Sequence, residues 1–363
     1  MSAADPFYVV ALRFKRGEQL GTKHLPRSVK EHTWPRWIVP PLAERKPEPT
    51  LFEMEPDGVP RIGRALVEAW PADLPVLVEI SHLFKELKER DPAEWIPRFY
   101  KAARHYRSVV VPVVRLCDLE GAVAQGFASS LQNGTVALLV TPTELDAPET
   151  GGRIKDGMAN IGATSPDCIV LIDFAKDDVS VPEVTADILA GAWETVESIL
   201  RWRFVALQAS NFPKKNPEPD KPERVKRTEW DAFQRTLQLE PSARGRLVYG
   251  DYAADHGKVT FRKASGGAPP HRMIRYTTPD EFVIVRGPDA GQQASVMRDV
   301  CKAIVADRSF RPMFSWGARA IEDRANGRTG SGGAVQWRAE NTNHHVALQF
   351  SLVEPLTTVE AAE

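Results

Sequence analysis

The sequence predicts an α/β fold, a closed (β/α)8 TIM-like barrel followed by a C-terminal elaboration. Apolar, β-branched runs recur about every 30 residues, which is roughly the length of one strand and helix unit. Eight such runs fall within residues 1–254, and this matches the strand number and length of a (β/α)8 barrel. An open doubly wound sheet is the alternative. The barrel is favoured because no Gly-x-Gly-x-x-Gly follows the first run to mark a dinucleotide crevice.

The clearest strand covers residues 74–83, an apolar run that ends in ionisable side chains. The second expected strand contains Pro40 and Pro41, which predicts a bulged or bent strand. A helix is expected to start at Pro92, because Asp91 can cap it and Glu94 completes the capping signal. The other predicted strands are 7–14, 37–44, 108–116, 135–143, 167–175, 203–211 and 246–253, and the predicted helices end near residues 32, 70, 106, 133, 202 and 237.

Residues 255–363 do not continue the repeat, and we expect them to form an insertion and elaboration packed on the barrel as one domain with it. Two short antiparallel strands are predicted within 273–286, around Thr278-Pro279-Asp280. An amphipathic helix at 292–307 is predicted to close the barrel. A helix at 319–326, a Gly-rich turn at 327–333 and a final strand at 346–352 follow.

Composition excludes several classes of partner. The 47 basic and 48 acidic residues leave a net charge of -1, so no global field favours nucleic acid or an anionic membrane. No apolar segment approaches the roughly 20 residues of a membrane span, and residues 1–7 lack the order of a signal peptide, so a cytoplasmic protein is expected. Cys117, Cys168 and Cys301 are too few and too far apart for a disulfide framework. No motif names a cofactor.

Residue parity along each strand selects candidate functional side chains, because successive side chains point to opposite faces. On the third strand Glu79 and Leu77 share one face, while the other face is uniformly apolar and suits packing against helices. The same test predicts a ring of polar side chains at the carboxyl end of the barrel, where barrel enzymes build their active sites. The ring comprises the carboxylates Glu44, Glu79, Asp173 and Asp251 as candidate catalytic groups, with Arg13, Lys15, Arg115 and Gln208 as candidate ligand-binding groups.

Two interpretations of this ring remain open. The charges could form a mutually paired layer that plugs the lumen, since buried charges need partners. Alternatively, the carboxylates could act as general acid and base while Lys15 and Arg115 hold an anionic group such as phosphate. Glu44, Glu79 and Asp173 could also bind Mg²⁺, but no tight spacing supports a metal site.

The C-terminal region adds a second group of candidates. Trp337, Arg338, Asn341 and Asn343 form a polar and aromatic cluster that either folds over the barrel mouth as a lid or packs as a structural motif. His344 and His345 are adjacent in the sequence, so in an extended chain their side chains point in opposite directions and cannot easily bind the same metal ion. Surface or interface positions are expected for both. The Gly-rich turn lacks the Lys-Ser/Thr of a phosphate-binding loop, and the charged stretch 214–227 is expected to be a solvated loop.

Short motifs spread over nearly the whole chain carry a resemblance to a known family. They are Tyr8 with Lys15 and Gly17-Glu18, Pro41-Leu42 with Glu44, Val78-Glu79-Ile80, Trp337-Arg338, and Asn343-His344-His345. In these the chain resembles the phage-type beta protein family. The resemblance implies a role in phage–host conflict, as an antitoxin or a defence component, with a toxin or other protein as partner. It assigns no role to the matching residues Lys15, Glu18, Glu44, Glu79, Trp337, Asn343, His344 and His345.

Two hypotheses of function follow. In the first, a polar barrel mouth binds a small anionic ligand or a protein partner in phage–host conflict. In the second, the barrel is an enzyme that performs acid-base or metal-assisted chemistry on a phosphoryl or nucleotide-like substrate. The arrangement of five side chains decides between a ligand site and a plug. A ligand site requires that they meet in an open pocket, and a plug requires that they pair with one another; they are Lys15, Glu44, Glu79, Arg115 and Asp173.

Overall fold

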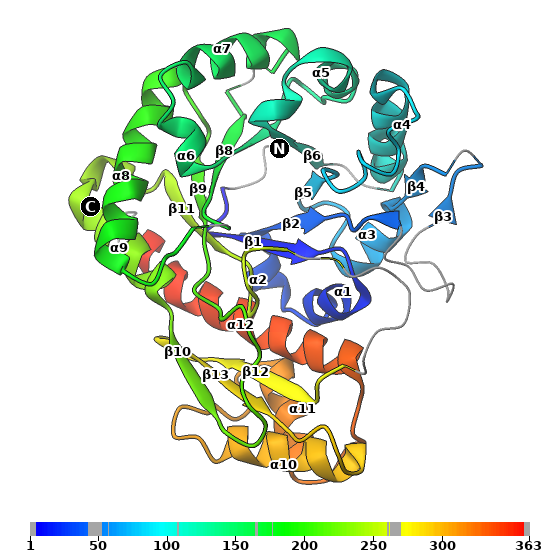
Figure 1. Cartoon of the computed structure of the whole chain (residues 1–363), viewed down its shortest axis with the longest axis vertical. Helices are drawn as coiled ribbons and strands as arrows, with labels where there is room; N and C mark the ends of the chain where they lie inside the picture. The colour runs from blue at the N-terminus through cyan, green and yellow to red at the C-terminus, as the bar shows by residue number, and fades with distance from the viewer. Residues whose placement is uncertain are drawn as a thin grey trace.

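The computed structural model describes residues 5–42, 53–56, 58–106, 109–163, 166–175, 177–259, 261 and 270–358. Within these residues eight parallel strands close into a barrel in the order β1-β11-β9-β8-β7-β6-β5-β2. The barrel, ringed by helices, forms the upper body in Figure 1. The predicted (β/α)8 barrel is therefore confirmed. Its strands are β1 Tyr8–Arg13, β2 Thr33–Ile38, β5 Val76–Glu79, β6 Val110–Arg115, β7 Ala137–Val140, β8 Ile169–Asp173, β9 Val205–Gln208 and β11 Leu247–Asp251.

Helices follow the strands, as the repeat predicted. Helix α4 begins as expected, with the Asp91 side chain accepting a hydrogen bond from the backbone N–H of Ala93 at 2.9 Å. The helix expected after the fourth strand begins at Gly121, after a short 3-10 turn that covers Leu116–Asp118. The helices of this part are α1 Arg16–Lys23, α2 Arg27–Glu31, α3 Gly63–Ala69, α4 Pro92–Arg104, α5 Gly121–Ala128, α6 Pro142–Leu145, α7 Thr150–Asn160, α8 Pro182–Ile199 and α9 Thr228–Leu239; a second 3-10 turn covers Pro241–Ala243, and β3 Glu53–Met54 pairs with β4 Pro60–Arg61.

The second strand lies earlier than predicted. Strand β2 covers Thr33–Ile38 and pairs with β1 along its whole length, whereas the prediction placed it at 37–44. Pro35 is accommodated within this barrel strand, whereas Pro40 and Pro41, which were expected to bend the strand, follow its end. Arg36 therefore lies on a barrel strand, just before the segment in which the second strand was expected.

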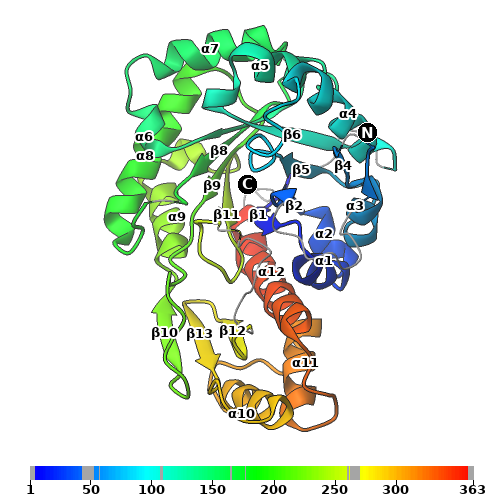
Figure 2. The same cartoon turned by 45° about the vertical axis from the view of Figure 1, so that its right-hand side comes forward.

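The C-terminal elaboration forms a second lobe below the barrel (Figures 1 and 2). Strands β12 Met273–Thr277 and β13 Glu281–Arg286 form the predicted antiparallel pair, and β10 Glu223–Lys226 joins them in a three-stranded sheet. The stretch expected to be a solvated loop therefore supplies a strand. Helices α10 Gln293–Val305 and α11 Trp316–Ala325 pack on this sheet through an apolar cluster that includes Ile274, Met297 and Ile321.

The helix that completes the barrel is the last one. Helix α12, Ala334–Thr358, runs from the lobe to the barrel and packs against α1, β1 and β12, as Figure 2 shows. Two predictions are therefore wrong: α10 packs on the lobe rather than closing the barrel, and residues 346–352 are helical rather than a strand. Gly21 of α1 allows the close approach of α12, because a Cβ at this position would lie 2.6 Å from the carbonyl oxygen of Ala339.

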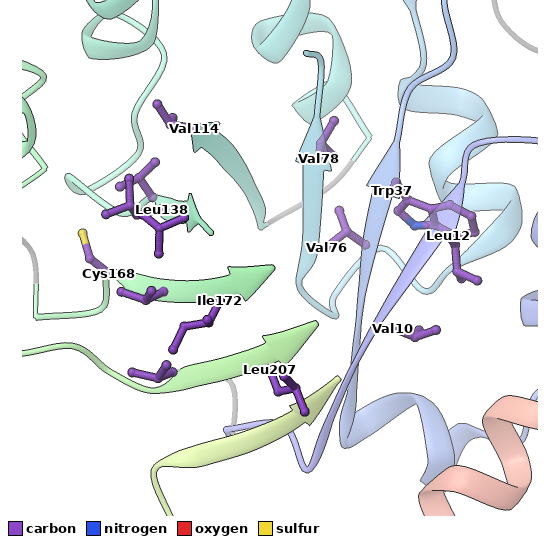
Figure 3. Packing of buried hydrophobic residues seen from close by; sticks show 14 of the residues in the cluster. Val10, Leu12, Trp37, Val76, Val78, Val114, Leu138, Cys168, Ile172 and Leu207 are labelled. Atoms are coloured by element: carbon purple, nitrogen blue, oxygen red, sulfur yellow. The ribbon is translucent and has the colours of Figure 1, made fainter. Parts of the chain in front are cut away.

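Parity divides the apolar strand residues into two cores. Outward side chains such as Val78, Leu138 and Ile172 pack beneath the helices (Figure 3). Inward side chains such as Leu77 and Leu171 fill the lumen. The lumen is thus a packed apolar core in its lower layers, and the polar layer around Arg36 lies at the carboxyl end of the strands.

Candidate functional site

Arg36 is the centre of the polar layer that closes the lumen. Its guanidinium donates two hydrogen bonds to Glu79 Oε2, at 2.9 Å from Nε and 2.7 Å from Nη2. The same group lies 3.3 Å from Asp173 Oδ2 and 3.3 Å from Gln208 Oε1. The three partners sit on β5, β8 and β9, so one cation on β2 ties together strands across the barrel.

The remaining polar atoms of this layer are also satisfied. Tyr252 donates to Asp173 Oδ1 at 2.5 Å, the backbone N–H of Ala175 donates to the same oxygen at 2.8 Å, and Ser81 donates to Glu79 Oε1 at 2.5 Å. Arg36 and Glu79 are 2% and 5% exposed, so the pair is almost sealed from water. Burial alone would raise the pKa of Glu79, but the Arg36 guanidinium and the Ser81 hydroxyl outweigh burial and hold it below its usual value. Glu79 is therefore an ionised, paired carboxylate.

A second charged cluster lies where the barrel meets the lobe. We call it the arginine cluster: Arg13 at the end of β1, Arg275 on β12 and Arg338 on α12, with Glu18 and Asp255 as their carboxylate partners. Arg338 donates to Glu18 at 3.0 Å and to Asp255 at 3.0 Å, and Arg275 donates to Asp255 at 2.8 Å. Arg13 contacts both carboxylates.

The arginine cluster carries more positive than negative charge. Burial and the neighbouring Arg338 lower the pKa of Arg13 to about 10, and the same two causes lower the pKa of Arg275 to about 9. For Glu18, burial raises the pKa, but Arg338 and Arg13 outweigh it and leave the pKa below its usual value. The three arginine side chains keep 16% to 21% of their surface exposed, so solvent reaches the cluster.

The other predicted ring residues are placed differently. Arg115 forms its ion pair with Asp118 of the following turn, at 2.8 Å, and interacts with Glu79 only through the electrostatic attraction between their charges. The Lys15 ammonium lies 5.2 Å from the centre of the Phe261 ring. Glu44 lies outside the described residues. Of the predicted ring, the structure thus brings Glu79, Asp173 and Gln208 together, and places Arg13 in the separate arginine cluster.

Asp251 points away from the lumen, so its predicted inward orientation is wrong. It shares the outer face of β11 with Tyr249, where Tyr8 donates to Oδ1 at 2.5 Å and His345 donates to Oδ2 at 2.8 Å. Thr277 contacts the other ring nitrogen of His345 at 2.9 Å. Asp251 and His345 are 1% and 0% exposed, so this network joins α12 to the barrel and to β12 without access for a substrate.

The other C-terminal candidates also hold helices together. His344 contacts the Thr277 carbonyl at 2.8 Å and stacks on Tyr276, and burial lowers its pKa to about 4. Asn343 bridges α1 and α11 through the Gly21 carbonyl and the Gly317 N–H. Trp337 donates to the Ser331 carbonyl. The surface or interface positions expected for the two histidines are not found, because both side chains are buried inside the protein.

Four residues of these two clusters were missed by the sequence analysis: Arg36, Tyr252, Asp255 and Arg275. Inward parity on the correct second strand, where Arg36 follows Trp34 by two residues, would have found the first of them. The others depend on which loop and which lobe strand meet the barrel mouth, and no local pattern contains that information.

The described ranges hold no group of three His, Cys, Asp or Glu side chains arranged to bind a metal ion. Across the same residues, no helix has the length and apolar character needed to cross a membrane. A cavity of about 500 Å³, lined by apolar side chains such as Phe7, Phe233 and Leu356, lies at the opposite end of β1 and β11 from both charged clusters.

Fold and site together define a (β/α)8 barrel protein with an internally paired charge layer in its lumen and an arginine cluster beside its mouth. The chain belongs to the Beta protein family, whose model matches residues 8–351. No curated protein matches the chain by sequence. Among solved structures it is similar to the catalytic domain of a hyperthermophilic chitinase from Pyrococcus furiosus, with 11% identity, a TM-score of 0.34, and coverage of 73% of this chain and 92% of that chain.

Proposed function

We propose that this protein binds a small anionic ligand at the arginine cluster and acts in phage–host conflict in the cytoplasm, as an antitoxin or a defence component. The observation that carries the ligand proposal is the charge of the cluster. Three guanidinium groups share the two carboxylates of Glu18 and Asp255, which leaves one positive charge in a partly desolvated position. Partial burial strengthens the attraction of such a group for an anion. The family resemblance supports the biological setting.

The enzyme hypothesis receives less support from the same geometry. A general acid or base must exchange a proton with a substrate, and its pKa must lie near the working pH. Glu79 is held ionised by Arg36, and Asp173 is bound by Arg36 and Tyr252. These contacts favour the paired layer over acid-base or metal-assisted chemistry on a phosphoryl substrate.

A partner protein, such as a toxin, is the second candidate, and one feature of the lobe favours it. Met313, between α10 and α11, is 59% exposed and adopts a φ of 60°, a conformation that costs a residue with a Cβ about 1–2 kcal/mol. Its exposed thioether side chain is a candidate point of contact for such a partner.

Calorimetric titration with inorganic phosphate, sulfate and acetate tests the ligand proposal. We expect at least one anion to bind with a stoichiometry of one, and Arg338→Gln to weaken binding about tenfold or more. Arg328→Gln is the matched control, because Arg328 is an exposed arginine that pairs with Asp323 away from the arginine cluster. Absence of binding to the unaltered protein at constant ionic strength would refute the proposal.

Phage challenge of cells that carry the variants separates the two candidates. Loss of protection with Arg338→Gln but not with Met313→Asp supports the ligand, and the reverse pattern supports the protein partner. Equal protection by both variants and the unaltered protein would contradict both.

A further inference from the structure

Asp255 is the shared partner of all three arginines in the arginine cluster. Its Oδ2 accepts from Arg338 at 3.0 Å and contacts Arg13, and its Oδ1 accepts from Arg275 at 2.8 Å. The arginines come from a barrel strand, a lobe strand and the last helix. The Asp255 carboxylate therefore lies where guanidinium groups from three separate elements, β1, β12 and α12, come together.

A carboxylate matches this position only in part. It offers one negative charge and two oxygens to three guanidinium groups. A phosphoryl group carries about -1.5 to -2 charge at neutral pH and presents three acceptor oxygens, and guanidinium forks bind it in a bidentate way. The charge and the number of donors around Asp255 thus suit a phosphoryl group better than the residue that is present.

Asp255 belongs to a different part of the chain from the arginines that surround it. It follows β11 in a turn where Ala253 has a φ of 54°, and its main chain is held by a hydrogen bond from Ser210 to the Asp255 carbonyl. Arg13 and Arg338 keep a second partner, Glu18, which is 2% exposed and fixed on α1. Withdrawal of the Asp255 side chain would therefore leave these two arginines positioned.

We infer that Asp255 is an internal occupant of a phosphoryl-binding site formed by Arg13, Arg275 and Arg338, and that a phosphate or phosphate monoester displaces its carboxylate on binding. This inference rests on the proposed function and names the ligand class of the same site. The lowered pKa values of Arg13 and Arg275, caused by burial and by Arg338, agree with a cluster in need of a further negative charge. Because the arginines join barrel and lobe, the bound anion would also tighten that junction.

The test is a titration of the full-length protein with inorganic phosphate at constant ionic strength, with acetate as the monovalent comparison. Asp255→Asn removes the competing charge and keeps the side-chain shape, so phosphate should bind it about tenfold more tightly than the unaltered protein. Acetate should bind both proteins at least tenfold more weakly than phosphate. Asp255→Ser serves as a second variant that also lacks the competing charge. Thermal melts of every variant show whether either substitution causes a folding defect.

The outcomes separate the inference from the proposed function. Tighter phosphate binding to Asp255→Asn and Asp255→Ser supports the inference. Phosphate binding that requires Arg338 but is unchanged by both Asp255 substitutions overturns the inference and leaves the proposed function standing. Preference for acetate over phosphate also overturns it. Absence of binding of every anion to the unaltered protein overturns both, because the inference rests on the proposed function.

Discussion

Replacement of Arg36 by methionine tests whether the luminal charges form a structural layer. Methionine keeps an unbranched apolar stem of similar length but removes the cation. Arg36, Glu79 and Asp173 have side chains that are 3%, 6% and 10% exposed, so the change leaves two carboxylates nearly buried without their guanidinium. Breaking a buried ion pair in this way costs about 3–5 kcal/mol. We expect a loss of that size in the free energy of unfolding at pH 7.

The pH dependence of Arg36→Met sharpens the test. In the unaltered protein the pKa of Glu79 is lowered, so its contribution to stability is present above its unfolded pKa and is lost as the pH falls through the folded value. In the variant, burial acts without the cation and raises the pKa of Glu79 above the unfolded value. Protonation then relieves the variant, and its deficit should shrink as the pH falls from 7 to 5.

Urea unfolding at pH 7 and pH 5, followed by tryptophan fluorescence, measures both effects. Arg27→Met is the control, because Arg27 is 50% exposed and pairs with Glu31 and Asp73 at the surface. Such surface pairs contribute at most about 1 kcal/mol. A loss below about 1 kcal/mol for Arg36→Met, or a deficit that does not change with pH, would refute the account of the lumen.

Three further substitutions probe the buried groups. Burial lowers the pKa of His344 to about 4, so the free energy of unfolding of the unaltered protein should fall by about 3 kcal/mol through this group as the pH falls from 6.5 toward 4. In urea titrations His344→Gln should lack this dependence on pH, and parallel curves for the two proteins would contradict the assignment. Burial raises the pKa of Glu229 to about 7, so its contribution to the free energy of unfolding is lost as the pH rises from 4.5 through 7. Over that range the stability of Glu229→Gln should rise by about 3 kcal/mol relative to the unaltered protein. A constant difference in stability would show that the pKa of Glu229 is not shifted. Gly21→Ala should lower the melting temperature, with a loss of about 1–3 kcal/mol in stability, because the new Cβ meets the Ala339 carbonyl. The control Gly152→Ala should raise the melting temperature, because its Cβ meets nothing within 4 Å. Equal effects would mean that α1 and α12 do not pack closely.

The sequence was sufficient to predict the barrel because its parallel strands are buried on both faces and read as continuous apolar runs. Strand parity then predicted that Glu79, Asp173 and Gln208 share one luminal layer. The opposite face of each strand is apolar and packs against the helices, so the polar side chain points into the lumen at its carboxyl end. The same reasoning failed for Asp251. Both faces of β11 are apolar, and the outer face receives a partner, His345, from a helix almost a hundred residues later.

The C-terminal elements were harder to predict for a related reason. Val346, Leu348, Phe350 and Leu352 alternate with smaller or polar residues, which is the period of a strand. In α12 they are nevertheless helical, since this helix is covered by α1, α11, β1 and β12 and has little exposed surface along that stretch to show a helical period. Asp255 and Arg275 joined the site through the tertiary path of the lobe, which sequence periodicity does not encode.

Whether the arginine cluster binds a phosphoryl-like anion can be seen in a crystal structure of the protein soaked with tungstate, a tetrahedral dianion visible by its anomalous scattering. We expect one strong peak among the guanidinium groups of Arg13, Arg275 and Arg338, with the Asp255 carboxylate turned away from them. Tungstate absent from this position, with Asp255 still paired to all three arginines, would contradict it.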